Sequence, residues 1–222
     1  MIEWAPASDD TSVSHPLCAG ARISHAPMEP YALRQHRVLL LSEPISAESA
    51  NRLVADLLLL NAASSTERID LYINSPGGSV TDGLAILDAM GCIQAPVSTI
   101  CIGQAASMAA WILASGAQGM RYATPNAEIM IHQLAAGFYG QSTHIRIMSQ
   151  RVLRLQKRLI EILASCTGQS HRRIAKDMER DFYMTAEEAR DYGIIDAILE
   201  PFPKTSMIRN QRVDQNGPEE CP

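Results

Sequence analysis

The chain has 222 residues, of which 46% are hydrophobic, and it carries a formal net charge of −5. This length and apolar content suit one domain with a sizeable core. The acidic balance and scattered basic residues argue against nucleic-acid binding, and no apolar run is long enough to span a membrane. The cysteines lack metal-ligand spacing. Cys92 and Cys101 lie in apolar surroundings, which favours buried free thiols in a reducing compartment and therefore a cytoplasmic protein.

Both ends of the chain lack a core-forming pattern. Residues 1 to about 30 are rich in Ser, Pro, Ala and Asp without periodicity, which predicts a flexible leader or propeptide. Residues 201–222 have the same character and are predicted to form a flexible tail. The folded domain is therefore expected over residues 31–200.

Between these ends, strand-like and helix-like segments alternate. Strands are predicted over residues 37–41, 69–73, 97–102 and 128–131. Helices are predicted after Ser46, where leucines recur at helical spacing, and after Ser79, which with Asp82 resembles a capping box. A further capped helix is predicted from Thr185 to Gly193. This alternation is typical of a largely parallel sheet covered by helices.

The motif Gly103-Gln104-Ala105-Ala106-Ser107-Met108 joins the third strand directly to an apolar helix. Such a turn of small residues holds a serine hydroxyl clear of its neighbours, at a helix N-terminus that favours developing negative charge. A serine becomes nucleophilic when a base lies in reach and a third group orients that base. His132 and Asp181 further along the chain could supply these groups. The pattern predicts a serine hydrolase.

A second motif, Asn74-Ser75-Pro76-Gly77-Gly78-Ser79, follows the second strand. Adjacent glycines permit a backbone path that leaves N–H groups pointing outward, as an anion cradle requires. By itself a Pro-Gly-Gly segment is more often an ordinary turn. Beside a nucleophilic serine, the N–H groups of Gly78 and Met108 could together bind the oxyanion of a tetrahedral intermediate.

A long amphipathic helix is predicted after about residue 140. Its apolar stripe, with members three and four residues apart, consists of Ile145, Met148, Val152, Leu155, Leu159 and Ile162. Periodicity alone favours a core helix that packs on its own sheet. The length of the helix and the glycine-containing loop before it also allow an arm that packs on a partner subunit.

Several motifs, taken together, resemble those of ClpP, the family of proteolytic subunits of the Clp protease. The matching segments are residues 72–78, 103–108, 125–126, 130–133, 167–169 and 180–181. The resemblance runs from about Tyr31 to Leu199. It keeps the family's spacings of 25 residues from Ser107 to His132 and 49 residues from His132 to Asp181.

The resemblance implies a role for each residue of the site. Ser107 would be the nucleophile, His132 the general base and then acid, and Asp181 the group that orients the imidazole. Gly78 and Met108 would be the oxyanion donors. No metal or cofactor is implied for this subunit, because the ATP is used by a partner unfoldase.

The resemblance also implies a crotonase-like spiral of ββα units with a protruding helical handle near residues 140–165. Family members form seven-subunit rings that stack into a barrel, on which AAA+ unfoldases such as Clp ATPases dock and feed unfolded proteins inward. The chain has no phosphate-loop motif of its own. The implied partners are further copies or a sister subunit, an unfoldase and unfolded substrates, with neither nucleic acid nor membrane.

Two surfaces can be mapped by the same resemblance. The ring–ring contact maps to Ile145, Met148, Val152, Leu155, Glu179 and Arg180. The unfoldase-docking pocket maps to Asp70, Tyr72, Cys92, Ile100, Ile102, Tyr122 and Leu199. Asp70 and Cys92 stand where many members carry aromatic residues. Residues 134–137 are Leu-Ala-Ala-Gly, where the family commonly has Pro-Leu-Gly-Gly in a strand that lines the substrate cleft. These departures indicate a divergent paralogue.

Three interpretations of function remain open. The first is an active ClpP-type serine endopeptidase, and the second is a catalytically weak or regulatory subunit of a mixed ring. The third is a crotonase-type acyl-CoA enzyme, which the intact set of Ser107, His132 and Asp181 disfavours because that chemistry needs no nucleophile. Since the family often trims N-terminal extensions, mature chains are expected to begin before Tyr31.

Overall fold

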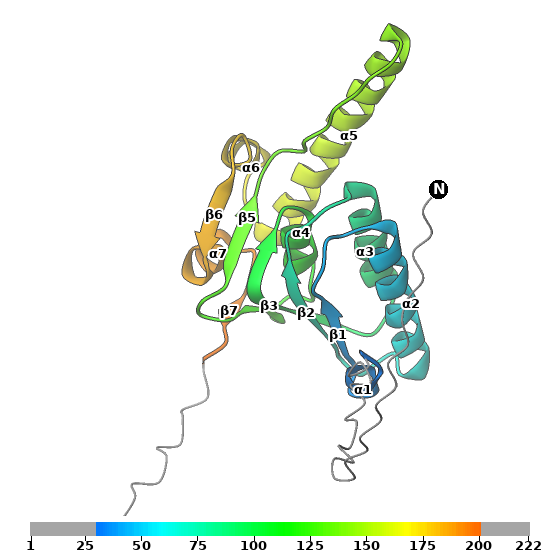
Figure 1. The fold of residues 1–222 in the computed structure, drawn as a ribbon. Coiled ribbons are helices and arrows are strands. Elements are labelled where there is room, and N and C mark those ends of the chain that lie inside the picture. The colour runs from blue at the N-terminus through cyan, green and yellow to red at the C-terminus, as the bar shows by residue number, and fades with distance from the viewer. Residues whose placement is uncertain (1–29, 201–222) are drawn as a thin grey trace, which may run out of the picture.

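The computed structural model describes residues 30–200, so the expected leader and tail lie outside the described residues. The helices are α1 (Pro30–Gln35), α2 (Ala47–Ala63), α3 (Val80–Cys92), α4 (Met108–Ala114), α5 (Ser142–Thr167), α6 (His171–Asp177) and α7 (Ala186–Tyr192). The strands are β1 (Val38–Leu41), β2 (Ile69–Ser75), β3 (Val97–Ala106), β4 (Arg121–Ala123), β5 (Glu128–Ile131), β6 (Phe182–Thr185) and β7 (Ala197–Ile198). Figure 1 shows their arrangement.

A single, mostly parallel sheet organises these elements. Its main path runs β1-β2-β3-β4-β7 with parallel pairing throughout. Strand β3 has ten residues, so it pairs with β4 earlier along its length and with β5 at its last residues. Strand β6 then adds to β5 in the antiparallel direction. The predicted α/β fold class is confirmed.

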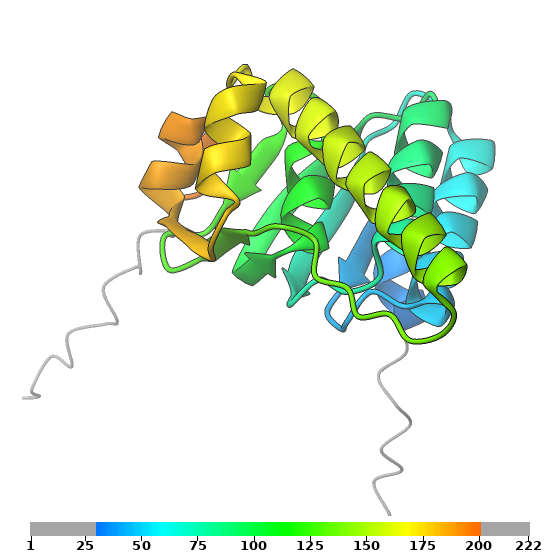
Figure 2. The same ribbon diagram turned by 90° about the horizontal axis from the view of Figure 1, so that it is seen from above.

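Helices α2, α3 and α4 cover one face of the sheet (Figure 2). The core between them contains fully buried side chains such as Leu57, Ile73 and Ile86. Every residue of α4 is buried, which explains why the segment after Ser107 is apolar on all sides. Burying one large aliphatic side chain contributes about 1.5–3 kcal/mol, so this layer fixes α4 and the serine before it.

The predicted helix caps are confirmed, with one difference. Ser46 caps α2, and Thr185 forms a capping box with Glu188 at the start of α7. At α3 the Ser79 hydroxyl accepts from the backbone of Asp82, but the reciprocal bond is replaced, because the Ser79 N–H is donated to the Ile45 carbonyl. Only half of that predicted capping box forms.

The two cysteines expected to be buried differ in their surroundings. Cys101 in β3 is fully buried, and this burial raises the pKa of its thiol to about 12. Cys92 is exposed, so the prediction is wrong for that residue. It is the last residue of α3, and the buried face of that helix ends at Met90.

Helix α5 has 26 residues and projects beyond the sheet, with the segment after β5 running alongside it (Figure 1). We call it the handle. Only Leu159 and Leu163 are buried, whereas Ile145, Ile147 and Leu153 are exposed. The core-helix interpretation therefore holds for the C-terminal end of α5 and is wrong for the rest. The earlier turns form a projecting arm whose apolar side chains are at most partly covered by the described chain.

A buried ion pair ties three helix ends to the sheet. The guanidinium of Arg121 in β4 bonds both carboxylate oxygens of Asp196, at 3.0 and 2.5 Å. Its Nη1 donates to the carbonyls of Ala114, Cys166 and Gly193, near the ends of α4, α5 and α7. The hydrogen bonds that Arg121 donates to the Asp196 carboxylate hold the pKa of that carboxyl group below its ordinary value.

We expect Asp196→Asn to lower the free energy of unfolding at pH 7 by about 3–5 kcal/mol, because it leaves the Arg121 charge buried and unpaired. The folded-state pKa of Asp196 is depressed, so its stabilisation is fully present above the unfolded-state pKa of about 4. The stabilisation is lost as the pH falls through the folded-state pKa. The difference in the free energy of unfolding between wild type and variant, measured by urea unfolding, should therefore shrink as the pH falls below about 4.

The control for this prediction is Asp191→Asn. Asp191 pairs with Arg190, but its side chain is 72% exposed, and exposed pairs contribute little. Its loss should leave stability nearly unchanged at every pH. An Asp196→Asn deficit that is as large at pH 3 as at pH 7 would contradict the assigned role of the carboxylate.

Candidate active site

Ser107 lies in the turn between β3 and α4. Its backbone angles are φ 54° and ψ −132°, a conformation that costs a non-glycine residue about 1–3 kcal/mol and is typical of functional sites. Its N–H is donated to the Met130 carbonyl at 2.8 Å, which ties the turn to β5. Strand β3 continues to Ala106, so residues 103–106 are strand, not the predicted turn, and the turn is confined to the serine.

His132 comes directly after β5, and the sheet brings it to Ser107. Strands β3 and β5 are parallel, with Ala106 opposite Met130, so their carboxyl ends lie side by side. The Nε2 of His132 lies 2.8 Å from the Oγ of Ser107, which is a hydrogen-bonding distance. The base and the nucleophile predicted from the sequence are therefore in contact.

Asp181 lies opposite His132, because antiparallel pairing places Ile131 against Phe182. Its Oδ1 is 3.8 Å from the Nδ1 of His132, and its side chain is 60% exposed. This separation is longer than a hydrogen bond. The structure thus brings all three predicted residues together, with the serine–histidine contact formed and the histidine–aspartate contact open.

The glycine pair after β2 approaches the serine turn. Gly77 and Gly78 have φ values of +85° and +148°, which only glycine adopts without strain. A Cβ on Gly77 would lie 2.7 Å from the Cβ of Ser107 and 2.9 Å from the Met108 nitrogen. The sequence analysis did not identify this contact of Gly77. The two adjacent glycines in the sequence could have indicated this contact, because glycines allow two backbone segments to approach closely.

The two predicted oxyanion donors, Gly78 and Met108, line the same cavity as Ser107. Ile45 bonds the carbonyl of Gly77 and the N–H of Ser79 in a parallel bridge, which directs the N–H of Gly78 to the other side of the segment. Met108 is the first residue of α4, so its N–H has no acceptor within the helix.

A cavity of about 290 Å³ opens beside Ser107. Its apolar lining consists of Pro76, Val80, Met108, Trp111, Met130, Leu134, Ala135 and Leu159. Trp111 follows Ser107 by one helical turn and donates its indole N–H to the Leu159 carbonyl at 2.9 Å. The sequence analysis missed Trp111, although the spacing of four residues places it on the serine's side of α4.

The segment after His132 contributes Leu134 and Ala135 to the wall of this cavity. The sequence comparison predicted that residues 134–137 form a strand. They adopt no strand pairing with any other described residue. A strand needs a partner strand for its backbone hydrogen bonds, and no described strand pairs with this segment.

Six of the residues mapped to the docking pocket lie on the strands of the sheet or directly after them. Tyr72, Ile100 and Tyr122 are register partners, so they form one row across the sheet. Asp70 lies two residues before Tyr72 on the same side of β2, and its carboxylate pairs with Arg68 at 2.8 Å. Ile102 lies two residues after Ile100, and Leu199 lies two residues after Ala197, the register partner of Tyr122. Cys92 lies apart from this row, at the end of α3.

The proposed ring–ring residues lie on the handle and before β6. Met148, Val152 and Leu155 are partly buried along α5, and Ile145 is exposed. Glu179 and Arg180 are exposed, and the Glu179 carbonyl accepts from the Gln133 side chain at 3.2 Å. Residues 179–180 are thereby connected to the segment that follows His132.

Two further kinds of site are absent from residues 30–200. This part of the chain contains no group of three or more His, Cys, Asp or Glu side chains that could hold a metal ion. None of its helices combines the length and apolarity that crossing a membrane requires.

A protein-family model described as Clp protease matches residues 27–202. The match covers well over half of the 222 residues and includes the serine turn, the glycine pair, the histidine and the aspartate.

Proposed function

This chain belongs to the Clp protease family, and we propose that it is an active serine endopeptidase of that family with Ser107 as its nucleophile. The observation that carries the proposal is the 2.8 Å contact between Ser107 Oγ and His132 Nε2, in a strained turn beside an apolar cavity. A serine-directed fluorophosphonate tests it. One adduct per chain by intact mass supports an active nucleophile, and no adduct contradicts it.

The proposed reaction begins when His132 Nε2 takes the proton of Ser107 Oγ as that oxygen attacks the substrate carbonyl. The resulting oxyanion is bound by the N–H groups of Gly78 and Met108, each worth about 3–4 kcal/mol of transition-state stabilisation. His132 then returns the proton to the leaving amine, and water hydrolyses the acyl-enzyme by the same steps in reverse.

Asp181 is proposed to orient the His132 imidazole and to stabilise its charged form. The 3.8 Å separation is consistent with this role, because catalytic contacts are often long before substrate binds and tighten in the complex. Glu179 and Arg180 directly precede Asp181. We propose that ring contacts through these two residues bring its carboxylate towards the imidazole.

Membership of the Clp protease family implies ring assembly and association with Clp ATPases in general. We propose stacked seven-subunit rings in the cytoplasm, homomeric or shared with a sister subunit, that degrade unfolded proteins delivered by the ATPase. The exposed apolar residues of the handle support the stacking. The alternative is a catalytically weak or regulatory subunit of a mixed ring, which the altered docking residues favour. A crotonase-type enzyme has less support, because it needs no Ser107–His132 contact.

We expect Gly83→Ala to lower the rate of peptide cleavage by about 10²-fold, as losing an oxyanion donor does. A Cβ at Gly83 in α3 would lie only 2.3 Å from Cγ of Met108, so the buried Met108 side chain, or α4 with it, would have to shift at the residue that donates to the oxyanion. The measurement is kcat on a fluorogenic peptide. Gly91→Ala in the same helix is the matched control, because its Cβ would meet no atom within 4 Å. Equal losses in both variants would contradict this role for Gly83.

The docking surface gives a second prediction. Apolar loops of an unfoldase would have to cover the partly exposed Asp70–Arg68 ion pair, and desolvating such a pair is costly. Cys92 also offers less contact area than an aromatic residue. We therefore expect weak binding of acyl peptide activators to homomeric rings. Asp70→Tyr with Cys92→Phe should tighten it about tenfold or more, which corresponds to 1.4 kcal/mol.

Isothermal calorimetry measures this affinity directly. Asp191→Tyr is a suitable control, because Asp191 is 72% exposed on α7 and is not among the residues mapped to the docking pocket. It should leave activator binding unchanged. Tight activator binding by the wild-type rings that the paired substitutions do not improve would refute the prediction.

A further inference from the structure

The position of the Asp181 carboxylate depends on the backbone that carries it. The side chain is 60% exposed, and its 3.8 Å approach to His132 is the one interaction that its carboxylate has with the described residues. Asp181 ends the short connection, residues 178–181, between α6 and β6. A side chain with so few contacts of its own is placed by its segment, so the contacts that fix the two ends of this connection determine where the carboxylate lies.

One buried side chain contacts the residues on both sides of this connection. Tyr192, the last residue of α7, is only 3% exposed. Its hydroxyl donates to Oδ2 of Asp177, the last residue of α6, at 3.1 Å. Its ring packs against the ring of Phe182, the first residue of β6, with 6.0 Å between the centroids and 47° between the planes. Asp181 therefore lies between two residues that are both held by Tyr192.

Further contacts hold Tyr192 itself in place. Its backbone carbonyl accepts a hydrogen bond from the Gln169 side chain at 3.0 Å. The Arg173 guanidinium lies 5.0 Å from the centre of the tyrosine ring, a cation–π distance, and pairs with Asp177 at 3.5 Å. Burial, and then the charge of Asp177, raise the pKa of Tyr192, so its hydroxyl stays protonated and donates. The tyrosine is thus a fixed point to which the connection is attached.

We propose that Tyr192 is a positioning residue for Asp181, a role that rests on the proposed serine endopeptidase function. By holding Asp177 and Phe182, it keeps the Asp181 carboxylate within a short movement of the imidazole. A misplacement of about 1 Å in such a group can lower a rate about 10²-fold. The cavity beside Ser107 is lined by other residues, so Tyr192 acts on the chemical step and not on substrate binding.

The rate of fluorophosphonate labelling, followed by intact mass, tests the proposal in the full chain. Tyr192→Phe removes only the hydroxyl and should lower this rate about tenfold, because the bond to Asp177 is lost while the ring contact remains. Tyr192→Leu removes both contacts and should lower the rate about 10²-fold. The native mass of Tyr192→Phe should equal that of wild type. An unchanged labelling rate in Tyr192→Phe, or a lower native mass, would overturn the proposal.

An Asp181→Asn background separates a positioning role from a purely structural one. Because Tyr192 acts through Asp181, Tyr192→Phe should change the labelling rate by less than about twofold in that background. On a fluorogenic peptide, Tyr192→Phe alone should lower kcat and leave KM unchanged. A purely structural tyrosine would cost the same factor in both backgrounds, and that result would overturn the proposal.

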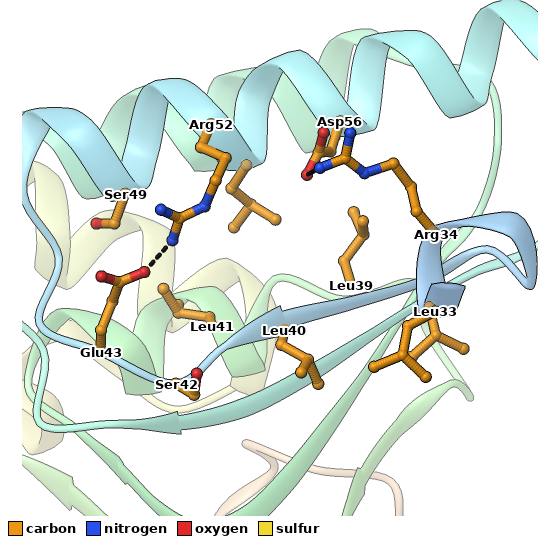
Figure 3. A pocket seen from close by; sticks show the side chains of 12 residues that line it. Leu33, Arg34, Leu39, Leu40, Leu41, Ser42, Glu43, Ser49, Arg52 and Asp56 are labelled. Carbon is orange, nitrogen blue, oxygen red and sulfur yellow. Dashed lines mark hydrogen bonds and ion pairs between the residues drawn. The ribbon is translucent and has the colours of Figure 1, made fainter. Parts of the chain in front are cut away.

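Two variants serve as controls. Tyr183→Phe makes the same hydroxyl deletion one residue after Phe182, at a side chain that is 54% exposed, and should label at the wild-type rate. Asp56→Asn breaks the 3.1 Å pair of Asp56 with Arg34 between α2 and α1 (Figure 3), beside the sheet edge β1 that lies opposite β6. It should destabilise the fold without changing the labelling rate. A lowered rate in Asp56→Asn would assign the effect to a general loss of stability and overturn the proposal.

Two outcomes distinguish the role of Tyr192 from the assignment of the nucleophile. The absence of an adduct on the wild type would contradict Ser107 as the nucleophile, and the role of Tyr192 with it. A wild type that is labelled at a rate insensitive to Tyr192→Phe would overturn the positioning role alone.

Discussion

Ser107→Ala is expected to abolish both fluorophosphonate labelling and peptide cleavage. Loss of the nucleophile of a serine protease lowers kcat by roughly 10⁶-fold, and only the binding and oxyanion contributions remain. The contact between Ser107 Oγ and His132 Nε2 singles out this serine among those of the described chain. Intact mass spectrometry measures the adduct, and hydrolysis of a fluorogenic peptide measures the rate.

The control for this prediction is Ser115→Ala. Ser115 lies at the other end of α4 and contacts Cys166, so its loss should leave labelling and cleavage intact. Asp181→Asn should lower the rate severely while the rings still assemble, because it changes the orientation and tautomer of His132 and not the fold. Labelling that survives Ser107→Ala would contradict the assignment of Ser107 as the nucleophile.

The second large effect is expected from Leu155→Asp on the handle. Leu155 is partly buried within an apolar stripe that the described chain does not cover at its N-terminal end. If the stripe packs between rings, a carboxylate there is desolvated without a partner, which costs several kcal/mol in every subunit. The variant should form single rings or smaller species with little activity. Native mass spectrometry of the wild type should give about fourteen copies of 24.2 kDa, alone or with a sister subunit.

Gln150→Asp is the matched control for this effect. Gln150 is exposed on the same helix and lies outside the apolar stripe, so the added charge should remain solvated. Assembly and cleavage should then be unchanged. A monodisperse, active wild-type monomer would contradict the handle proposal, and so would an active Leu155→Asp protein of full native mass.

Local sequence determined most of the elements that hold the site. Residues 128–131 form a strand with the predicted bounds, and Ser46 and Thr185 cap helices as expected, because caps and periodicity depend on neighbours in the chain. The short elements α1, β4, α6, β6 and β7 were missed. Strands of two to four residues carry little periodic signal, and they exist because a neighbouring strand accepts their hydrogen bonds.

The residues of the candidate site also fall into those that the sequence identified and those that only the structure identified. Motifs and their spacing identified Ser107, His132 and Asp181, because nucleophile, base and orienting group are distinctive residue types in a distinctive order. Gly83 and Trp111 were not identified. Their parts in the site come from contacts across the fold, of Gly83 with Met108 and of the indole with a carbonyl of α5. A glycine within a helix has no local signature of such a contact, and the four-residue spacing of Trp111 from Ser107 indicates only that both lie on one side of α4.

The handle and the triad show what only the tertiary structure decided. A sequence period shows that one side of α5 is apolar, but the arrangement of the other elements determines whether that side meets the chain's own core or projects from it. Similarly, the spacing of 49 residues carries no information about the 3.8 Å between His132 and Asp181. That distance is set by the pairing of β5 with β6 and by the exposed position of the carboxylate, which are properties of the folded chain.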